Sequence, residues 1–356
     1  MKERPLKSQY EMPKDLQSQL LKSPKHYLVT GGAGFIGSNL VETLLRLGQT
    51  VTTLDNFSTG SKMNLEQVKN LVGKNNWERH RLIEGDITNI DLCAEACRNV
   101  DIVLHQAAIG SVPRSVADPL VTHNANATGF LNMLISAKDA GVERFVYAAS
   151  SSTYGDSDIL PKVESIIGNP LSPYAVTKYL NELYARVFSS CYGIETIGLR
   201  YFNVFGPRQD PDGAYAAVIP KWIGSILKGE QCVINGDGET TRDFCFVANA
   251  VQANLRSSII DNSKAINQVY NVAFGVQTSL NNLHEMLTKN LSDLVSGLFV
   301  QDPSYNDFRI GDVAHSLADI SKAKRYLNYS DLIDFKTGLQ ITSSWFAESI
   351  LNIDIN

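Results

Sequence analysis

From Lys25 onward, short runs of β-branched and other apolar residues alternate with longer amphipathic stretches. This alternation is typical of repeated strand–helix–strand units, which build a parallel sheet with helices on both faces. The runs predict strands at His26–Thr30, Thr50–Asp55, Arg81–Glu84, Asp101–His105, Phe145–Ala149, Thr196–Tyr201 and Val269–Ala273. We therefore expect an α/β fold with a Rossmann-like, doubly wound parallel sheet of about seven strands.

A glycine-rich segment, TGGAGFIG, follows the first predicted strand directly and opens a predicted helix. Gly31 permits a tight turn, Gly34 allows the backbone to approach a pyrophosphate, and Gly37 lets the helix pack closely on the strand. The amides and the positive dipole end of that helix then bind the anion. The next strand ends at Asp55, whose carboxylate can bind a ribose 2′-hydroxyl and would repel a 2′-phosphate. The sequence therefore predicts an NAD site rather than an NADP site.

The alternation of predicted strands and helices is interrupted between about residues 204 and 246, which are rich in Gly, Pro and Asp. Since the strand near residue 270 returns to the sheet, we expect two interleaved units. The NAD-binding domain comprises residues 25–203 and about 247–277, and a smaller C-terminal substrate lobe comprises about 204–246 and 278–356. Residues 1–24 form an N-terminal extension, in which Leu16, Leu20 and Leu21 predict one apolar helix face.

Tyr174 and Lys178 lie four residues apart at the start of a predicted helix, Pro173–Cys191, so their side chains share one helix face. Free tyrosine, with a pKa of about 10, is a poor base at neutral pH. A nearby ammonium and a cationic nicotinamide both favour the phenolate, so we expect the pKa of Tyr174 to be lowered. Together with the phosphate loop, the pair indicates a tyrosine base beside a nicotinamide.

These segments, with DNFSTG, EGDI, HQAA, SSSTYG, RYFNVFGPRQDP, TRDF and FRIGDVAHSLAD, resemble the extended short-chain dehydrogenase/reductase family over roughly residues 25–320. Within that family the chain is similar to the nucleotide-sugar 4-epimerases. The segments HQAAIGSVPRS, SSSTYGD and AYAAVIPKW most resemble bacterial epimerases that prefer UDP-GlcNAc and UDP-GalNAc. The resemblance implies that Ser150 joins Tyr174 and Lys178 in catalysis and bridges the sugar O4 and the tyrosine.

The resemblance also implies which residues surround each ligand. NAD would be bound by Gly31, Gly34, Phe35, Ile36, Gly37, Asp55, Asn56, Ser58, Gly60, Asp86, Ile87, Gln106, Ala107, Ala108, Tyr174, Lys178 and Tyr201. A UDP-N-acetylhexosamine would be bound by Gly110, Ser111, Ser150, Ser151, Ser152, Tyr174, Asn203, Ala217, Val218, Lys221, Arg242, Arg309, Asp312 and Ser316. Since no cluster of the histidines has ligand spacing, we expect no metal.

The residues that follow Ser150 separate related reactions. Relatives share proton removal from the 4-hydroxyl and hydride transfer from C4 to NAD. A 4,6-dehydratase also needs an Asp-Glu pair at the next two positions, and a UDP-glucuronate decarboxylase needs a Glu there. Here these positions hold Ser151 and Ser152, which cannot shuttle protons in that way. The serines favour a 4-epimerase, which turns a transient 4-keto sugar over and needs no further acid or base.

The residue four places after Asp312 bears on the sugar. In the family a bulky Tyr there restricts the pocket to glucose and galactose, whereas Ser316 leaves room for an N-acetyl group. Gly110 and Ala217 are also small. We therefore expect interconversion of UDP-GlcNAc and UDP-GalNAc. A UDP-glucose/UDP-galactose or UDP-glucuronate 4-epimerase, a 4,6-dehydratase and a non-catalytic NAD sensor remain alternatives, the last disfavoured by the catalytic residues.

Composition limits the partners. A net charge of −5 argues against a nucleic-acid ligand. No apolar run approaches the roughly 18 residues of a membrane span, and the N-terminus lacks the apolar core of a signal peptide. With five scattered cysteines, this predicts a cytoplasmic protein that does not contact membranes. Predicted helices near residues 119–140 and 173–191 have apolar residues on more than one face, and in relatives such helices pair across a two-fold axis, so we expect a homodimer.

Overall fold

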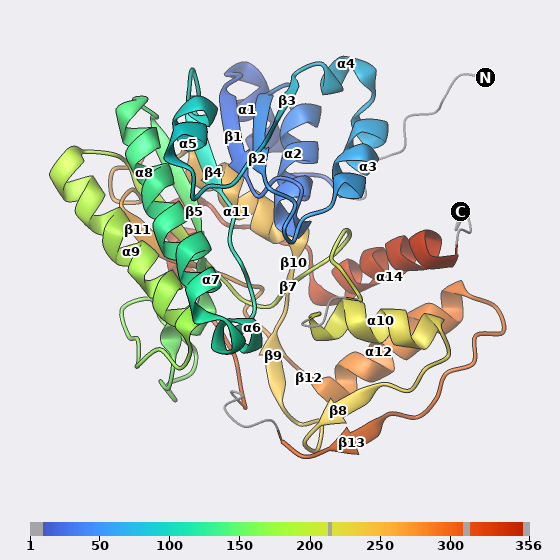
Figure 1. The fold of residues 1–356 in the computed structure, drawn as a ribbon. Coiled ribbons are helices and arrows are strands. Elements are labelled where there is room, and N and C mark those ends of the chain that lie inside the picture. Colours follow the sequence, from blue (N-terminus) through green and yellow to red (C-terminus); the bar gives the residue numbers. More distant parts are fainter. Residues whose placement is uncertain (1–9, 213–215, 309–313, 352–356) are drawn as a thin grey trace.

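A seven-stranded parallel sheet organises the molecule, in the order β11-β6-β5-β4-β1-β2-β3 (Figure 1). The computed structural model describes residues 10–212, 216–308 and 314–351. The sheet strands are β1 (His26–Thr30), β2 (Thr50–Asp55), β3 (His80–Glu84), β4 (Ile102–His105), β5 (Arg144–Ser150), β6 (Thr196–Tyr201) and β11 (Gln268–Val272). The predicted doubly wound fold is confirmed. The strand order reverses between β1 and β4, where such sheets bind ligands at the carboxyl ends of the strands.

Helices cover both faces of the sheet, and strand residues alternate between two cores. Tyr27 and Val29 pack in a core with α2 (Phe35–Arg46) and α11 (Val247–Ile259). Leu28, between them, packs in the opposite core. That second core includes residues of α5 (Ile90–Ala96), α8 (Gly129–Asp139) and α9 (Pro173–Tyr192). Successive strand side chains point to opposite faces, so both faces of a central strand must be apolar.

The remaining elements connect these layers or build the smaller lobe. The other helices are α1 (Lys14–Lys22), α3 (Lys62–Val72), α4 (Lys74–Trp77), α6 (Val112–Ala117), α7 (Pro119–His123), α10 (Val218–Leu227), α12 (Leu280–Leu294), α13 (Ser321–Leu327) and α14 (Phe335–Leu351), with a π-helical turn at Asn124–Thr128 and a 3₁₀ turn at Ser151–Tyr154. Short strands are β7 (Val204–Phe205), β8 (Val233–Asn235), β9 (Thr241–Asp243), β10 (Cys245–Phe246), β12 (Gln277–Ser279) and β13 (Ser304–Asn306).

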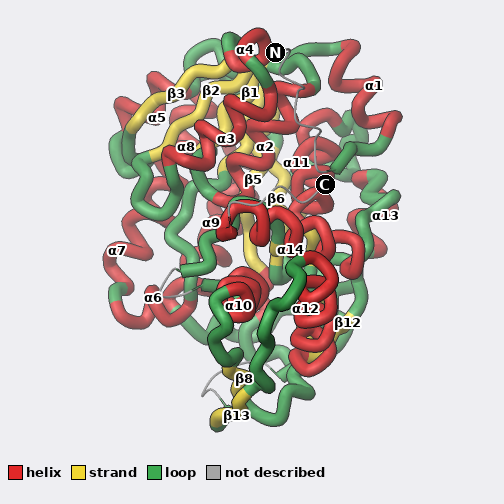
Figure 2. Tube along the Cα trace, turned by 90° about the vertical axis from the view of Figure 1, so that its right-hand side faces the viewer, coloured by secondary structure: helices red, strands yellow, loops and turns green. Residues whose placement is uncertain are grey.

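The smaller lobe lies at one end of the sheet (Figure 2). Its helices α10, α12 and α14 pack together, and its strands pair as β8 with β13 and β9 with β12. The pair β7 and β10 joins the segment after β6 to the start of α11. Helix α13 contacts β11, so this part of the C-terminal segment packs beside the large sheet.

Two local expectations differ from the structure. The predicted helix near residues 119–140 is divided into α7, a π-helical turn and α8. In the N-terminal extension, Leu16 and Leu20 are buried in the core, but Leu21 is 55% exposed, so the apolar face is narrower than expected. None of the helices in the described ranges is long and apolar enough to cross a membrane.

Candidate active site

The glycine-rich loop brings the start of α2 to the carboxyl end of β1. Gly31 has a φ of 67°, in the left-handed region that favours glycine, and a Cβ there would lie 2.8 Å from the Ala107 Cα. At Gly37, a Cβ would lie 2.0 Å from the Gly31 carbonyl oxygen. No side chain could replace either hydrogen without moving backbone. The loop therefore packs against β1 and β4, and the first amides of α2 face the edge of the sheet.

The carboxylate of Asp55 is fixed beside this loop. Its Oδ2 accepts a hydrogen bond from the Ala33 amide at 2.8 Å, and its Oδ1 accepts one from the Phe57 amide at 2.8 Å. Burial raises the pKa of the Asp55 carboxyl, while the two amides oppose that shift. The sequence placed Asp55 at the end of the second strand, and the structure adds the backbone contacts that orient it.

A cavity of about 750 Å³ runs along this edge of the sheet. Its lining includes each residue that was expected to bind NAD: Gly31, Gly34, Phe35, Ile36, Gly37, Asp55, Asn56, Ser58, Gly60, Asp86, Ile87, Gln106, Ala107, Ala108, Tyr174, Lys178 and Tyr201. The cavity combines a helix N-terminus for an anion with carboxylates at the ends of β2 and β3. These features fit an extended dinucleotide with a diphosphate in the middle and ribose hydroxyls on either side.

The three expected catalytic side chains meet in the same cavity. Ser150 ends β5, and Tyr174 and Lys178 lie in the first turns of α9. Pro173 begins this helix, and its N-cap hydroxyl, from Ser172, accepts the Ala175 amide at 3.1 Å. Proline and a capping serine are the usual residues at a helix start, so local sequence places the tyrosine on the first turn.

Hydrogen bonds order the serines in front of Tyr174. The Ser152 amide and hydroxyl both donate to Ser150 Oγ, at 3.1 Å and 2.8 Å. A hydrogen bond with Ser150 lowers the pKa of Tyr174, although burial has the larger effect and raises it overall. Because Ser150 Oγ accepts from Ser152, its own proton is available for a partner on the cavity side.

Lys178 is buried close to Tyr174. Its ammonium donates to the Ala148 carbonyl oxygen at 2.9 Å and lies 6.0 Å from the centre of the Tyr174 ring. Burial lowers the pKa of Lys178 to about 8. The Tyr174 shift has burial and Ser150 as its causes, and the expected lowering of this pKa by Lys178 and a nicotinamide stays a prediction for the NAD-bound enzyme.

The expected substrate residues fall into two groups. Gly110, Ser150, Tyr174 and Asn203 line the cavity. Outside its lining are Ser111, Ser151, Ser152, Ala217, Val218, Lys221, Arg242 and Ser316. Arg309 and Asp312 lie outside the described residues.

On the smaller lobe, Ser316 lies next to Arg242. The Ser316 amide donates to the Thr241 carbonyl oxygen at 3.1 Å, and Arg242 Nη1 donates to the Ala314 carbonyl oxygen at 3.3 Å. The structure therefore brings these two predicted residues together on β9 and its neighbouring segment. Val204 and Gln209, from the segment expected to belong to the smaller lobe, line the cavity.

Several cavity residues were not expected from the sequence. Val121, Asn124 and Ala125 come from α7 and the π-helical turn, and Gln209 comes from the segment after β7. The apolar periodicity of residues 119–140 predicts a continuous helix and carries no signal for the π turn. The turn contains Asn126, whose side chain accepts a hydrogen bond from the Ile109 amide and donates one to the Ile109 carbonyl.

A closed ring of hydrogen bonds supports the floor of the cavity. Tyr201 Oη donates to Gln106 Oε1 at 2.9 Å, Gln106 Nε2 donates to Asn254 Oδ1 at 3.0 Å, and Asn254 Nδ2 donates to Tyr201 Oη at 2.7 Å. Asn254 is fully buried on α11, outside the cavity. It was missed because its partners lie far from it in the sequence.

His105 is a structural residue. Its Nδ1 lies 2.9 Å from Thr30 Oγ1, and its ring packs against Phe130 and Phe145. Burial and the nearby Lys178 charge lower its pKa to about 3. The imidazole is therefore neutral near pH 7, and its low pKa makes it a weak base. Among the residues of the described ranges, no group of His, Cys, Asp and Glu is arranged to hold a metal ion.

Comparison with known proteins gives consistent matches. The profile of the NAD dependent epimerase/dehydratase family matches residues 27–273. A putative UDP-glucose 4-epimerase of Methanocaldococcus jannaschii is 36% identical over 320 residues, covering 89% of this chain and 97% of that protein. A solved UDP-N-acetylglucosamine 4-epimerase of Methanobrevibacter ruminantium, in complex with UDP-N-acetylmuramic acid, is 39% identical with a TM-score of 0.83, covering 92% of this chain and 99% of that chain.

A third similar protein was solved with its cofactor. It is a UDP-glucuronic acid 4-epimerase variant of Bacillus cereus in complex with NAD and a 4-deoxy-4-fluoro analogue of UDP-glucuronic acid. It is 28% identical to this chain, with a TM-score of 0.81, covering 91% of this chain and 99% of that chain. The matches extend over both the sheet and the smaller lobe.

Proposed function

This chain belongs to the NAD dependent epimerase/dehydratase family, and from that premise we propose that it is a 4-epimerase that interconverts UDP-GlcNAc and UDP-GalNAc. NAD is its cofactor, and the enzyme belongs to the UDP-sugar 4-epimerases. The observation that carries the reaction type is the serine pair at the end of β5. Ser152 and Ser150 are hydrogen-bonded in a row before Tyr174, and no carboxylate stands at the two positions after Ser150.

The chain's own residues then have distinct roles. When bound, NAD supplies the hydride acceptor and donor at the sugar C4, together with a positive ring charge. Tyr174 takes the proton of the 4-hydroxyl through Ser150 and returns it after the sugar has turned over. Lys178, held by the Ala148 carbonyl, binds the nicotinamide ribose and orients it. Lys178 and the positive ring charge of bound NAD would both offset the burial that raises the Tyr174 pKa.

The preference for an acetylated sugar rests on Ser316. This small side chain lies beside Arg242, which we propose as a ligand of the substrate diphosphate with Asn203, Arg309 and Asp312. A bulky residue in place of Ser316 would remove the space for the N-acetyl group. The similarity to a UDP-N-acetylglucosamine 4-epimerase supports this preference, and the similarities to UDP-glucose and UDP-glucuronic acid epimerases keep those sugars as the alternatives.

The test uses purified enzyme without added cofactor. We expect UDP-GlcNAc to be converted to UDP-GalNAc, and UDP-glucose and UDP-glucuronate to react more slowly or not at all. Substitution Ser316→Tyr should reduce kcat/KM for UDP-GlcNAc at least tenfold and leave that for UDP-glucose within about twofold. Formation of a 4-keto-6-deoxy sugar would contradict the epimerase, and an unchanged UDP-GlcNAc rate in the variant would contradict the role of Ser316.

We also propose a cytoplasmic homodimer. Exposed apolar side chains gather on neighbouring helices, with Leu120 and Val121 on α7 and Val176 and Val187 on α9, and α7 packs against α9. A contiguous exposed apolar surface is typical of an interface. The unpaired thiols suit a reducing compartment. Sedimentation should give twice the chain mass, and Val176→Asp with Val187→Asp should give a monomer, whereas a monomeric wild type would refute the dimer.

The expected division into two interleaved units is also part of the proposed function. We propose that residues 25–203 and about 247–277 hold NAD and that about 204–246 with 278–356 hold the nucleotide sugar. The cavity supports this division, since its lining combines the loop after β1 with Val204 and Gln209.

A further inference from the structure

The N-terminal segment Tyr10–Lys22 is firmly attached to the NAD-binding domain. Leu16 and Leu20 are at most 1% exposed and belong to the core shared with α2 and α11. The Asp15 carboxylate is paired with the guanidinium of Arg256 on α11, with Arg256 Nη2 donating to Asp15 Oδ1 at 3.0 Å. Gln49 Nε2 donates to the Leu20 carbonyl oxygen at 3.0 Å. These contacts hold the start of the segment close to α2.

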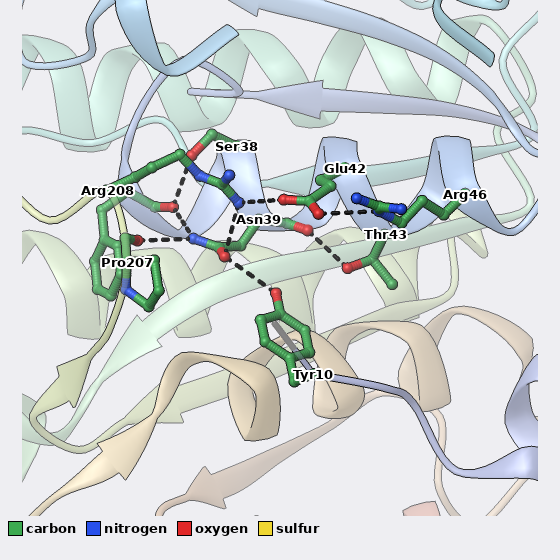
Figure 3. A network of polar contacts seen from close by, with 9 residues as sticks. Tyr10, Ser38, Asn39, Glu42, Thr43, Arg46, Pro207 and Arg208 are labelled. Carbon is green, nitrogen blue, oxygen red and sulfur yellow. Dashed lines mark hydrogen bonds and ion pairs between the residues drawn. The ribbon is translucent and has the colours of Figure 1, made fainter. Parts of the chain in front are cut away.

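This segment places Tyr10 beside Asn39 on α2, a side-chain amide whose hydrogen-bonding sites are all occupied (Figure 3). Tyr10 Oη donates to Asn39 Oδ1 at 3.1 Å, and Arg208 Nη2 donates to the same oxygen at 2.8 Å. Asn39 Nδ2 donates to the carbonyl oxygens of Phe35 at 2.9 Å and Pro207 at 3.2 Å. Since a side-chain amide has two donor hydrogens and two acceptor sites, Asn39 is saturated and its orientation is fixed.

A buried ion pair shares this network. Arg208 Nη2 also donates to Glu42 Oε2 at 2.7 Å, and Glu42 Oε1 accepts from Arg46 Nε at 3.0 Å. The side chains of Arg208 and Glu42 are 2% and 10% exposed. Arg208 has a φ of 69°, a strained backbone conformation for a residue with a side chain. The network therefore holds the Pro207–Arg208 segment in a shape that it would not keep by itself.

This network joins two walls of the NAD cavity. One wall is the start of α2, where Phe35 and Gly37 line the cavity only a few residues before Asn39. The other is the segment after β6, in which Val204 and Gln209 line the cavity and Pro207 bonds to Asn39. The two walls lie far apart in the sequence, so the distance between them depends on tertiary contacts such as these hydrogen bonds.

We propose that the N-terminal segment is a strap that retains NAD, with Tyr10 as a positioning residue that fixes Asn39 and thereby holds the 204–209 segment against α2. Tyr10 does not line the cavity and acts through Asn39 and Arg208. Its ring also packs edge-on against Phe246 at the start of α11, with the ring centres 5.8 Å apart, so the strap contacts the junction of the two units as well. Loosening it should open the cavity and speed the release of the cofactor.

The direct test is Tyr10→Phe, which keeps the ring on Phe246 and removes only the hydroxyl. The matched control is Tyr305→Phe, because Tyr305 Oη donates to Asn281 Oδ1 at the same 3.1 Å but lies on the smaller lobe, outside the cavity lining. Purified NAD-loaded enzyme is mixed with isotopically labelled NAD, and exchange is followed by mass spectrometry. We expect release to be about fivefold faster in Tyr10→Phe and unchanged in the control, as for loss of a partly buried hydrogen bond between uncharged groups.

Two further measurements separate a strap from a general effect on stability. Hydrogen–deuterium exchange of the loaded enzyme should increase at residues 204–209 in Tyr10→Phe and stay unchanged at β3. Asp15→Asn, which weakens the anchor outside the network, should also speed NAD release. A Tyr10→Phe enzyme with a lower melting temperature but the wild-type release rate would overturn the proposal, as would unchanged exchange at residues 204–209.

Discussion

At the scale of single residues, the chemistry depends on a few side chains whose surroundings set their behaviour. The Tyr-x-x-x-Lys spacing identified Tyr174 and Lys178 from sequence, because an i,i+4 pair shares a helix face. Spacing could not reveal that Lys178 donates to the Ala148 carbonyl, or that Ser152 donates to Ser150. The first contact joins α9 to β5 and the second joins the 3₁₀ turn to the end of β5, and a pattern within one helix contains no information about its neighbour.

The hydrogen bond between Ser152 and Ser150 leads to a prediction about proton transfer. Ser152→Ala removes the hydroxyl that donates to Ser150 Oγ, so Ser150 should be less well oriented toward Tyr174. We expect kcat to fall about tenfold, with KM and bound NAD unchanged, which is within the range of one lost proton-transfer partner. Steady-state kinetics and NAD content check this. Ser157→Ala, on the loop beyond the row, is the control and should keep wild-type kcat.

At the scale of secondary structure, apolar periodicity predicted the seven strands closely because the central strands β1, β4, β5 and β6 are buried on both faces. Apolar periodicity was less accurate in two helical segments. The sequence of the π-helical turn at Asn124–Thr128 predicts an ordinary α-helix. The turn is fixed by a hydrogen bond from the Ile109 amide to Asn126. In α1 the three leucines were expected to share one face, yet only two of them reach the core.

The two kinds of leucine in α1 give a prediction with an internal control. Leu16→Ala should lower the free energy of unfolding by about 2–4 kcal/mol, because the side chain is fully buried and its loss leaves a cavity. Leu21→Ala, on the same helix but 55% exposed, should change it by less than about 0.5 kcal/mol. Urea denaturation of the NAD-loaded proteins measures both. Equal effects would mean that α1 does not pack as the structure has it.

At the scale of the whole molecule, stability depends on groups that folding removes from water. His105 is 2% exposed, and its pKa falls to about 3 in the folded protein from about 6.5 in the unfolded chain. The unfolded chain therefore binds an extra proton between these pH values, and stability decreases as the pH falls below about 6.5. Lowering the pH from 7 to 5 should cost about 2 kcal/mol through this residue alone.

That acid sensitivity can be measured by difference. His105→Asn removes the titrating ring and leaves an amide near Thr30. The loss of stability between pH 7 and pH 5 should be smaller than in the wild type by about 2 kcal/mol. His123→Asn, at an exposed position, should keep the wild-type difference. Denaturant titrations at the two pH values provide the measurement, and an unchanged difference in His105→Asn would show that the ring is not held neutral.

The sequence by itself determined the sheet, the phosphate loop and the tyrosine–lysine pair, because each rests on short-range periodicity or spacing, and the family resemblance implied the role of the serines beside them. Only the tertiary structure decided which distant residues meet. It joined Tyr10 to Asn39 and Arg208, closed the ring of Gln106, Tyr201 and Asn254, and set Ser316 beside Arg242. The physical reason is that local propensities act over a few residues, whereas these contacts depend on how whole elements pack. The N-terminal extension, which no motif explained, gains its proposed role only from that packing.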